Sequence, residues 1–204
     1  MTAPLSPPAA ATPPFHGKRL LYLTTGGIQA MLLPNWLSWL RTHYPHTEVR
    51  SVLTPSARRF VGTTAVAAVS GQGLPTIDVW PDEPDRALHV HLATWPDAVL
   101  VHPATMHFIA RLSLGLADTP ALLALQCTRA PIVICPSLPP DGHRNPAYQR
   151  HILELSERDN VTVLPPVNGT SVTTGQEGIG SAAFLPHALS ALEDLRTWTQ
   201  CDAS

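Results

Sequence analysis

Short apolar runs alternate with longer segments of helical period along most of the chain, and this alternation constrains the fold more than any other feature. Residues 19–25, 48–54 and 97–101 have the length and apolar character of buried strands. Over residues 29–43, apolar side chains recur every three or four positions, which is typical of a helix with one buried face. Strands that alternate with helices across short loops predict an open, mostly parallel sheet with helices on both faces.

The remaining segments continue this pattern. Further strands are expected at residues 76–80, 130–135 and 161–164, and further helices at 56–61, 63–69, 105–117, 146–157 and 186–199. Pro146 suits the first turn of its helix, because proline lacks the N–H that would be unpaired there. The sequence therefore predicts an α/β fold of the Rossmann-like or flavodoxin-like type.

The length and composition bound the number of domains. A chain of 204 residues, 44% of them hydrophobic, can bury one core, so residues 18–199 are expected to form a single domain. Residues 1–17 are rich in Pro, Ala, Ser and Thr, which predicts a flexible N-terminal tail, and residues 200–204 are expected to form a second, short tail. Charged residues make up only 14% of the chain, and this low share favours contacts between subunits.

Several classes of function are disfavoured by charge, hydropathy and cysteine content. The formal net charge is −2 with no basic block, which argues against nucleic-acid partners. No apolar run approaches the roughly 18–20 residues of a membrane span, and the N-terminus lacks the charged start and apolar core of a signal peptide. The chain has an odd number of cysteines, Cys127, Cys135 and Cys201, without CxxC spacing, so neither a disulfide framework nor a zinc site is expected. Cys135 is predicted to be a small, buried, hydrophobic side chain. These features favour a cytoplasmic enzyme.

Ligands of open parallel sheets bind outside the carboxyl ends of the strands, which directs attention to three loops. These loops span residues 24–29, 54–56 and 102–107. Thr24, Thr25, Gly26 and Gly27 offer hydroxyls and unhindered backbone N–H groups before a helix, an arrangement that suits a phosphate. A plain tight turn is an equal alternative at this point, and the GxGxxG fingerprint of dinucleotide binding is absent.

Several motifs, taken in order, resemble those of one enzyme family. Residues 25–28 (TGGI), 89–97 (HVHLATWPD), 102–107 (HPATMH) and 115–118 (GLAD) are similar to the TGSI, HIxLxxWAD, APATAN and GIAD motifs of the homo-oligomeric flavin-containing cysteine decarboxylases. This flavoprotein family includes phosphopantothenoylcysteine decarboxylase and the peptidyl-cysteine decarboxylases of lanthipeptide biosynthesis. The resemblance covers about residues 18–195.

The resemblance implies a bound flavin, FMN more readily than FAD, because the phosphate loop provides one anion site. It implies a trimer or a dodecamer of this chain, and a precursor peptide that ends in cysteine as the partner. The residues expected to hold the flavin are Thr25, Gly26, Gly27, Ile28, Thr54, Ser56, Phe60, Pro103, Ala104, Thr105 and Met106.

The same resemblance implies two catalytic histidines. His89 matches the family's general acid/base, with a hydrogen-bonded structural histidine as the alternative. His91 would share its face if this stretch were extended. His107 replaces an Asn that holds the substrate carboxylate in the family, and a protonated imidazole could donate to that carboxylate instead.

Two further departures bear on the substrate and the product. The family's clamp motif PxMNxxMW occurs here as residues 136–143 (PSLPPDGH), in which Pro136, Leu138 and His143 are the candidate substrate contacts. Thr174 stands where the coenzyme A branch has a cysteine that reduces the enethiol product. Because threonine has no redox chemistry, the reaction is expected to stop at the enethiol.

The resulting hypothesis is flavin-dependent oxidative decarboxylation of the C-terminal cysteine of a ribosomal, lanthipeptide-type precursor peptide. The enethiol product can cyclise to an aminovinyl-cysteine. Two alternatives stay open. The changed Asn and clamp are compatible with a non-catalytic, flavin-binding or regulatory homologue. A flavin prenyltransferase would need a basic site, to which Arg58, Arg59 and Arg111 could contribute.

Overall fold

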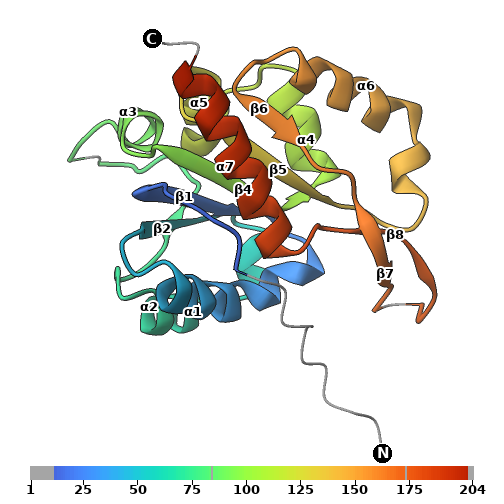
Figure 1. Cartoon of the computed structure of the whole chain (residues 1–204), viewed down its shortest axis with the longest axis horizontal. Coiled ribbons are helices and arrows are strands. Elements are labelled where there is room, and N and C mark those ends of the chain that lie inside the picture. The colour runs from blue at the N-terminus through green and yellow to red at the C-terminus, as the bar shows by residue number, and fades with distance from the viewer. Residues whose placement is uncertain (1–11, 84, 173, 202–204) are drawn as a thin grey trace, which may run out of the picture.

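The computed structural model describes residues 12–83, 85–172 and 174–201, and its centre is a six-stranded parallel sheet (Figure 1). The order across the sheet is β3-β2-β1-β4-β5-β6. The strands are β1 (Arg19–Thr24), β2 (Glu48–Leu53), β3 (Thr76–Ile77), β4 (Ala98–Thr105), β5 (Ile132–Ser137) and β6 (Val161–Val163). This arrangement confirms the predicted α/β fold.

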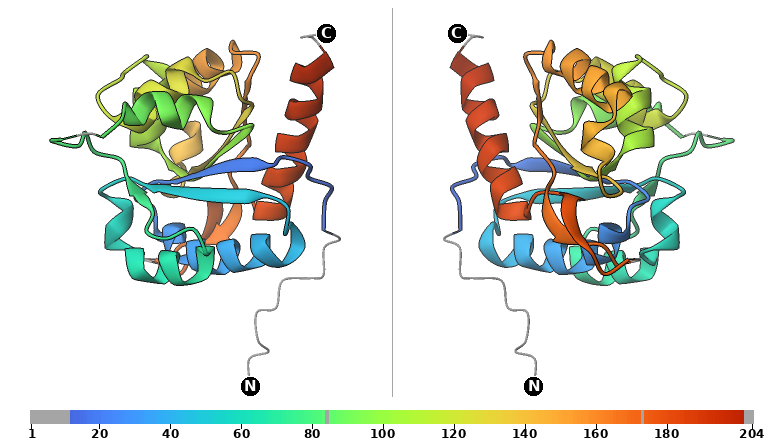
Figure 2. Two further views of the ribbon diagram at one scale, coloured as in Figure 1. Left: turned by 90° about the vertical axis from the view of Figure 1, so that its left-hand side faces the viewer. Right: turned by 90° about the vertical axis from the view of Figure 1, so that its right-hand side faces the viewer.

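Helices cover both faces of the sheet (Figures 1 and 2). One face carries α1 (Leu33–His43), α2 (Thr63–Ser70) and α7 (Leu185–Cys201), and the other carries α3 (Leu88–Thr94), α4 (Met106–Ser113), α5 (Pro120–Cys127) and α6 (Pro146–Ser156). Strand β1 shows why its sequence is apolar throughout: Leu20 and Tyr22 join the core on the α1 side, while Leu21 and Leu23 join the core on the α4 side.

The segment around the predicted 97–117 junction differs from the expectation at its boundaries. Strand β4 continues to Thr105 through a shift of register between Val101 and Ala104, and the following helix ends at Ser113. A separate helix, α5, begins after Thr119, whose hydroxyl accepts a hydrogen bond from the Leu122 N–H. Thr119 followed by a proline is a helix-start signal, so this missed helix could have been found in the sequence.

An antiparallel hairpin, which the sequence analysis also missed, lies apart from the main sheet (Figure 1). It consists of β7 (Val167–Thr170) and β8 (Glu177–Ser181). Two hydrogen bonds hold its base to the domain: Leu138 N–H donates to Gly180 O at 2.7 Å, and Ala182 N–H donates to the Gln29 side-chain oxygen at 2.7 Å.

The packed part of the chain begins closer to the N-terminus than expected. Residues 1–11 of the expected tail lie outside the described residues, but Phe15 is buried with its ring 5.8 Å from that of Tyr44. Tyr44 in turn donates to Pro13 O at 2.7 Å. The backbone N–H of His16 donates to Glu193 on α7. Residues 13–17 therefore belong to the packed structure and not to a flexible tail.

The C-terminal end and the cysteines complete the description. Helix α7 extends to Cys201, and residues 202–204 of the expected second tail lie outside the described residues.

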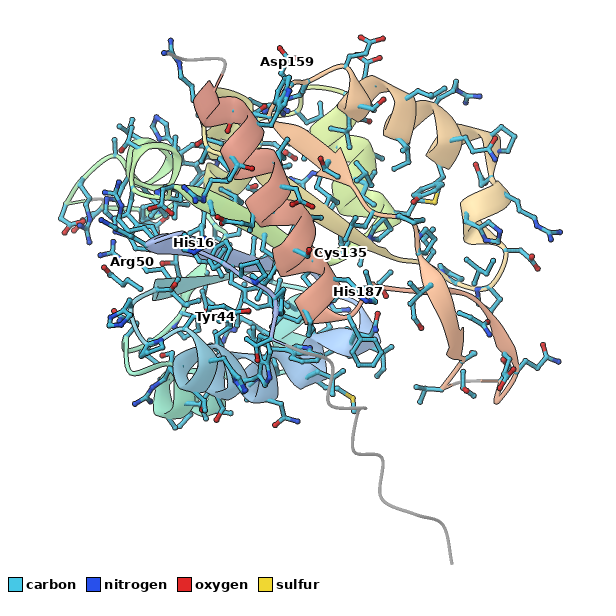
Figure 3. All side chains as sticks on the ribbon, in the orientation of Figure 1. His16, Tyr44, Arg50, Cys135, Asp159 and His187 are labelled. Carbon is cyan, nitrogen blue, oxygen red and sulfur yellow. The ribbon has the colours of Figure 1, made fainter. Side chains whose placement is uncertain are left out.

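Cys135 is fully buried beside α7 (Figure 3), as predicted, and burial raises the pKa of its thiol. Among the described residues, no helix combines the length and the apolar character needed to cross a bilayer.

Candidate functional site

The site lies where the strand order reverses, between β1 and β4. The chain leaves β1 toward β2 on one side and leaves β4 toward β5 on the other, so the two following loops diverge and open a space. Thr25 ties the two strand ends together. Its N–H and its hydroxyl both donate to Pro103 O, at 3.1 and 2.8 Å, and its Oγ1 accepts from the Thr105 N–H at 2.8 Å.

Two glycines allow close approach at this point. A Cβ at Gly26 would lie 2.4 Å from the Ser56 Cβ, so the loops after β1 and β2 touch only because residue 26 has no side chain. A Cβ at Gly27 would lie 3.3 Å from the Ser137 Oγ at the end of β5. A hydroxyl from a different strand therefore lies next to Gly27. Sequence reasoning missed Ser137 because its proximity depends on the fold.

These loops border a cleft of about 510 Å³, within the usual range for small-molecule sites. The cleft brings together six residues that the sequence predicted: Thr25, Gly26, Thr54, Ser56, Thr105 and His107. It also includes residues that the sequence did not single out for it, and these are Pro55, Asp78, Val79, Trp80, Phe108, Arg111, Asp118 and Thr119.

The other residues predicted for the flavin lie near these loops without lining the cleft. Pro103 and Ala104 are buried in β4. Gly27 and Ile28 begin the short helix η1 (Ile28–Leu32), Phe60 ends η2 (Ala57–Arg59), and Met106 begins α4. Ile28 and Phe60 are exposed apolar side chains, at 42% and 38%.

His102 has a structural role at the junction. Its Nε2 lies 2.9 Å from Ala183 O, and a carbonyl can only accept, so Nε2 carries the proton. Its Nδ1 then accepts from the Tyr22 hydroxyl at 2.9 Å. Burial lowers the pKa of His102 and favours the neutral ring, although the hydrogen bond to Ala183 O acts in the opposite direction.

His107 lies at the cleft on the first turn of α4, with Arg111 one turn further along the same helix face. The Arg111 Nη2 donates to Asp118 Oδ1 at 2.5 Å, and this hydrogen bond is the main cause of the lowered pKa of Asp118. At the other side of the cleft, Asp78 is buried and accepts from the Ala121 N–H at 2.8 Å, while burial raises its pKa. The cleft thus combines the imidazole of His107 with Arg111, which is paired with the Asp118 carboxylate.

His89 is not in this cleft. The stretch that carries it is helix α3 and not an extended segment, so His89 and His91 point in different directions. His89 faces a groove between α3 and α5, called the α3–α5 groove below, which is lined by His89, Val90, Ala93, Thr94, Pro96, Leu123, Cys127, Arg129 and Ala130. The His91 Nε2 instead lies 2.7 Å from Arg50 Nη1, whose guanidinium stacks over Trp95. The expectation that His89 and His91 share a face is wrong, because a helix turns by about 100° per residue.

The three candidate substrate residues gather at the end of β5. Pro136 and Leu138 are buried, and the Leu138 backbone is bonded to the hairpin at Gly180. His143 lies in η3 (Gly142–Arg144), and its Nδ1 is buried without a hydrogen-bond partner among the described residues. Thr174 is exposed in the connection between β7 and β8. The clamp segment and the hairpin are thus neighbours, as a shared substrate surface would require.

Comparison with known proteins decides the family. A family model described as flavoprotein matches residues 11–191, nearly the whole chain. This chain belongs to the flavoprotein family. Cypemycin cysteine dehydrogenase (decarboxylating) of Streptomyces sp. is 36% identical over 185 residues, covering 89% of this chain and 94% of that protein. The coenzyme A biosynthesis bifunctional protein CoaBC of Haemophilus influenzae is 32% identical over 181 residues, and there the chain spans 44% of its relative's length.

Solved structures agree with this assignment. The crystal structure of the cypemycin decarboxylase CypD matches with a TM-score of 0.73 and 33% identity, covering 90% of this chain and 96% of that one. The FMN-dependent cysteine decarboxylase SpaF matches with a TM-score of 0.75 and 29% identity, covering 88% and 97%. The predicted fold and family are confirmed.

The cleft fits the phosphate-bearing end of a flavin. Hydroxyls of Thr54, Ser56 and Thr105 border it, and the missing side chain at Gly26 leaves the backbone of the first loop open to a phosphate. Trp80 and Phe108 add aromatic surface. This combination of hydroxyls, open backbone and aromatic side chains matches the chemistry of a flavin mononucleotide.

Proposed function

We propose that this chain is a flavin-dependent peptidyl-cysteine decarboxylase that acts on the C-terminal cysteine of a ribosomally made precursor peptide. The observation that carries the proposal is the cleft at the strand reversal, where Gly26, Ser56 and Thr105 meet the first turn of α4. The 36% identity to cypemycin cysteine dehydrogenase (decarboxylating), over nearly the full length of both chains, supports the same reaction type.

FMN is the proposed cofactor, because the cleft offers one set of phosphate-binding groups and SpaF is named FMN-dependent. When bound, the flavin supplies the oxidation of the cysteine CH₂–SH to a thioaldehyde by accepting two electrons and the hydrogen atoms lost. The thioaldehyde sulfur then accepts the electron pair of the breaking C–C bond as CO₂ leaves. Protonation of that sulfur gives the enethiol.

His107 is proposed to orient the substrate carboxylate. A protonated imidazole donates to a carboxylate, and the Arg111 charge one turn away adds to the attraction. Arg111 is itself restrained by Asp118, so it acts mainly through its field. A hydrogen bond to the substrate carboxylate helps the reaction only if that bond weakens as CO₂ leaves. His107 is exposed and in exchange with solvent, which suits this requirement.

His89 is proposed as the general acid/base, although it lines the α3–α5 groove and not the cleft of its own chain. The two sites are separated by Trp80, which lines the cleft and contacts His89. We therefore propose that His89 serves the cleft of a second copy in a homo-oligomer. The proposed trimer or dodecamer would meet this requirement if its interface places the groove of one subunit against the cleft of another.

The enethiol is the proposed final product, leading to an aminovinyl-cysteine in a lanthipeptide-type pathway. The connection between β7 and β8 carries Thr174, which has no thiol to reduce the enethiol further. The altered clamp, with Leu138 and His143, is proposed to accept a peptide different from those of other branches of the family.

The test is a mass measurement. The purified chain is loaded with FMN and incubated aerobically with a peptide ending in cysteine, and the expected product is lighter by CO₂ and two hydrogens. The same peptide with an amidated C-terminus is the matched control and should not react, because it has no carboxylate to lose. A yellow protein that leaves both peptides unchanged would favour the non-catalytic alternative, and a protein that binds no flavin would overturn the proposal.

Two substitutions test the histidine roles. His89→Asn is expected to slow CO₂ release by roughly 10²- to 10⁴-fold, the usual contribution of a general acid/base, while leaving the flavin bound, since His89 does not line the cleft. His107→Asn restores the family's residue and is expected to retain turnover. His187→Asn, an exposed histidine on α7, is the control and should be neutral.

A further inference from the structure

Trp80 stands between the cleft and the α3–α5 groove. It follows β3 by three residues and lines the cleft together with His107, Arg111 and Asp118. Its ring also lies 5.5 Å from the His89 ring, centroid to centroid, at an interplanar angle of 65°. One side chain therefore contacts both the flavin cleft and the histidine proposed as the general acid/base.

The orientation of Trp80 is fixed by a hydrogen bond. Its indole N–H donates to the Asp118 backbone oxygen at 2.9 Å. Asp118 is in turn held by Arg111 through its carboxylate. The ring is 46% exposed, so this hydrogen bond is needed to keep it in one position at the surface.

His89 lacks the hydrogen bond that usually orients a catalytic histidine. Its Nδ1 is buried and has no partner among the described residues. In most sites where histidine moves protons, a carboxylate or carbonyl bonded to the second ring nitrogen sets the ring direction. The His89 ring instead makes an edge-to-face contact with Trp80, and aromatic pairs of this geometry are directional.

We propose that Trp80 is a positioning residue for His89. The chain of contacts runs from Arg111 through the Asp118 backbone to the Trp80 indole and ends at the His89 ring. Packing against Trp80 takes the place of that hydrogen bond and sets the direction of the His89 ring. The inference rests on the proposed function, because it concerns how the proposed general acid/base is held.

The experiment replaces the ring in the FMN-loaded, full-length protein. Trp80→Leu is expected to lower kcat roughly 10- to 100-fold, the usual effect of a small misplacement of a catalytic group. The KM for the peptide is expected to stay within about twofold. Because Trp80 also lines the cleft, kcat is measured at saturating FMN, so that weaker FMN binding does not lower it. Trp80→Phe keeps an aromatic ring beside His89 but loses the indole donor to Asp118 O, and is expected to have a kcat between those of Trp80→Leu and the unchanged protein. Trp198→Leu removes an equally exposed tryptophan (49%) from α7 and is the control.

The outcomes separate this inference from the proposed function. If Trp80→Leu leaves kcat unchanged, or changes only KM and FMN affinity, then Trp80 acts only as a lining residue of the cleft. The inference that it positions His89 is then wrong. Trp80→Leu should also add no further loss to the residual turnover of His89→Asn, because the two residues act through one group. If His89→Asn itself keeps full activity, the role proposed for His89 fails first. If Trp80→Leu does not fold, the kcat of Trp80→Phe is compared with that of the unchanged protein. A lower kcat in Trp80→Phe supports the inference, and an equal kcat contradicts it.

Discussion

The contact between the first two loops of the cleft can be tested by adding a single methyl group. In Gly26→Ala the new Cβ would lie 2.4 Å from the Ser56 Cβ, 3.0 Å from its carbonyl carbon and 3.2 Å from its carbonyl oxygen. Carbon atoms in good contact lie about 3.5–4.0 Å apart, so the loops must separate by about 1 Å. Overpacking of this kind costs roughly 1–3 kcal/mol.

The loss should appear in both stability and cofactor binding. In a chain of this size, each kcal/mol lowers Tm by roughly 2–4 °C, which a thermal melt of the flavin-free protein detects. The phosphate side of the cleft is formed by the same two loops. FMN affinity is therefore expected to fall as well, by about tenfold for each 1.4 kcal/mol that the displacement costs the bound state. Quenching of flavin fluorescence during titration measures that affinity.

Two companion variants make the result interpretable. Ser56→Gly removes the nearest carbon atom, so the double variant Gly26→Ala/Ser56→Gly is expected to recover most of the Tm lost by the single one. Gly178→Ala, in β8, adds the same methyl group where no atom lies within 4 Å, and is expected to be neutral. Normal Tm and FMN affinity in Gly26→Ala would show that the loops do not touch, and the account of the cleft would be wrong.

Three other substitutions test the supports of the fold. His102→Ala leaves the Ala183 carbonyl unpaired in the core and is expected to cost about 2–5 kcal/mol in urea unfolding. Because burial lowers the pKa of His102, the unfolded chain gains this proton at a higher pH than the folded one. Stability therefore declines as pH falls below about 6.5, and the variant should lose this part of the pH dependence. The hydrogen bond from Arg196 is the main cause of the lowering of the Glu193 pKa to about 2, so its stabilisation is present above about pH 4.5 and is lost as pH falls toward 2. Glu193→Gln should therefore unfold more readily at pH 7 but differ little from the unchanged protein near pH 2. Asn145→Ala removes the side-chain oxygen that caps α6 and is expected to cost about 1 kcal/mol in the same urea assay.

The architecture could be predicted because it rests on local patterns. Strands buried on both faces must be apolar throughout, and helices on a sheet must carry an apolar stripe, so β1, β2 and β5 and the helices α1 and α6 were found close to their observed positions. The boundaries around β4 were not found, because residues 102–105 continue the strand through an irregular register that depends on contacts with β1 and β5. Helix α3 was missed because seven residues carry too little periodic signal.

The strand pattern of the sequence was enough to select the candidate loops, because the carboxyl ends of parallel strands meet at one edge of the sheet. The three loops selected by that rule contain Thr25, Thr54 and Thr105, which the family resemblance assigned to the flavin, and the cleft contains all three. The tertiary structure, in contrast, placed the candidate residues in two different cavities, the cleft and the α3–α5 groove. Trp80 comes from the end of β3 and Asp118 from the turn before α5, and they meet because the strand order brings distant loops together. His89 is turned away from the cleft of its own chain by one short helix, and sequence spacing does not specify that direction, because it is set by what the helix packs against.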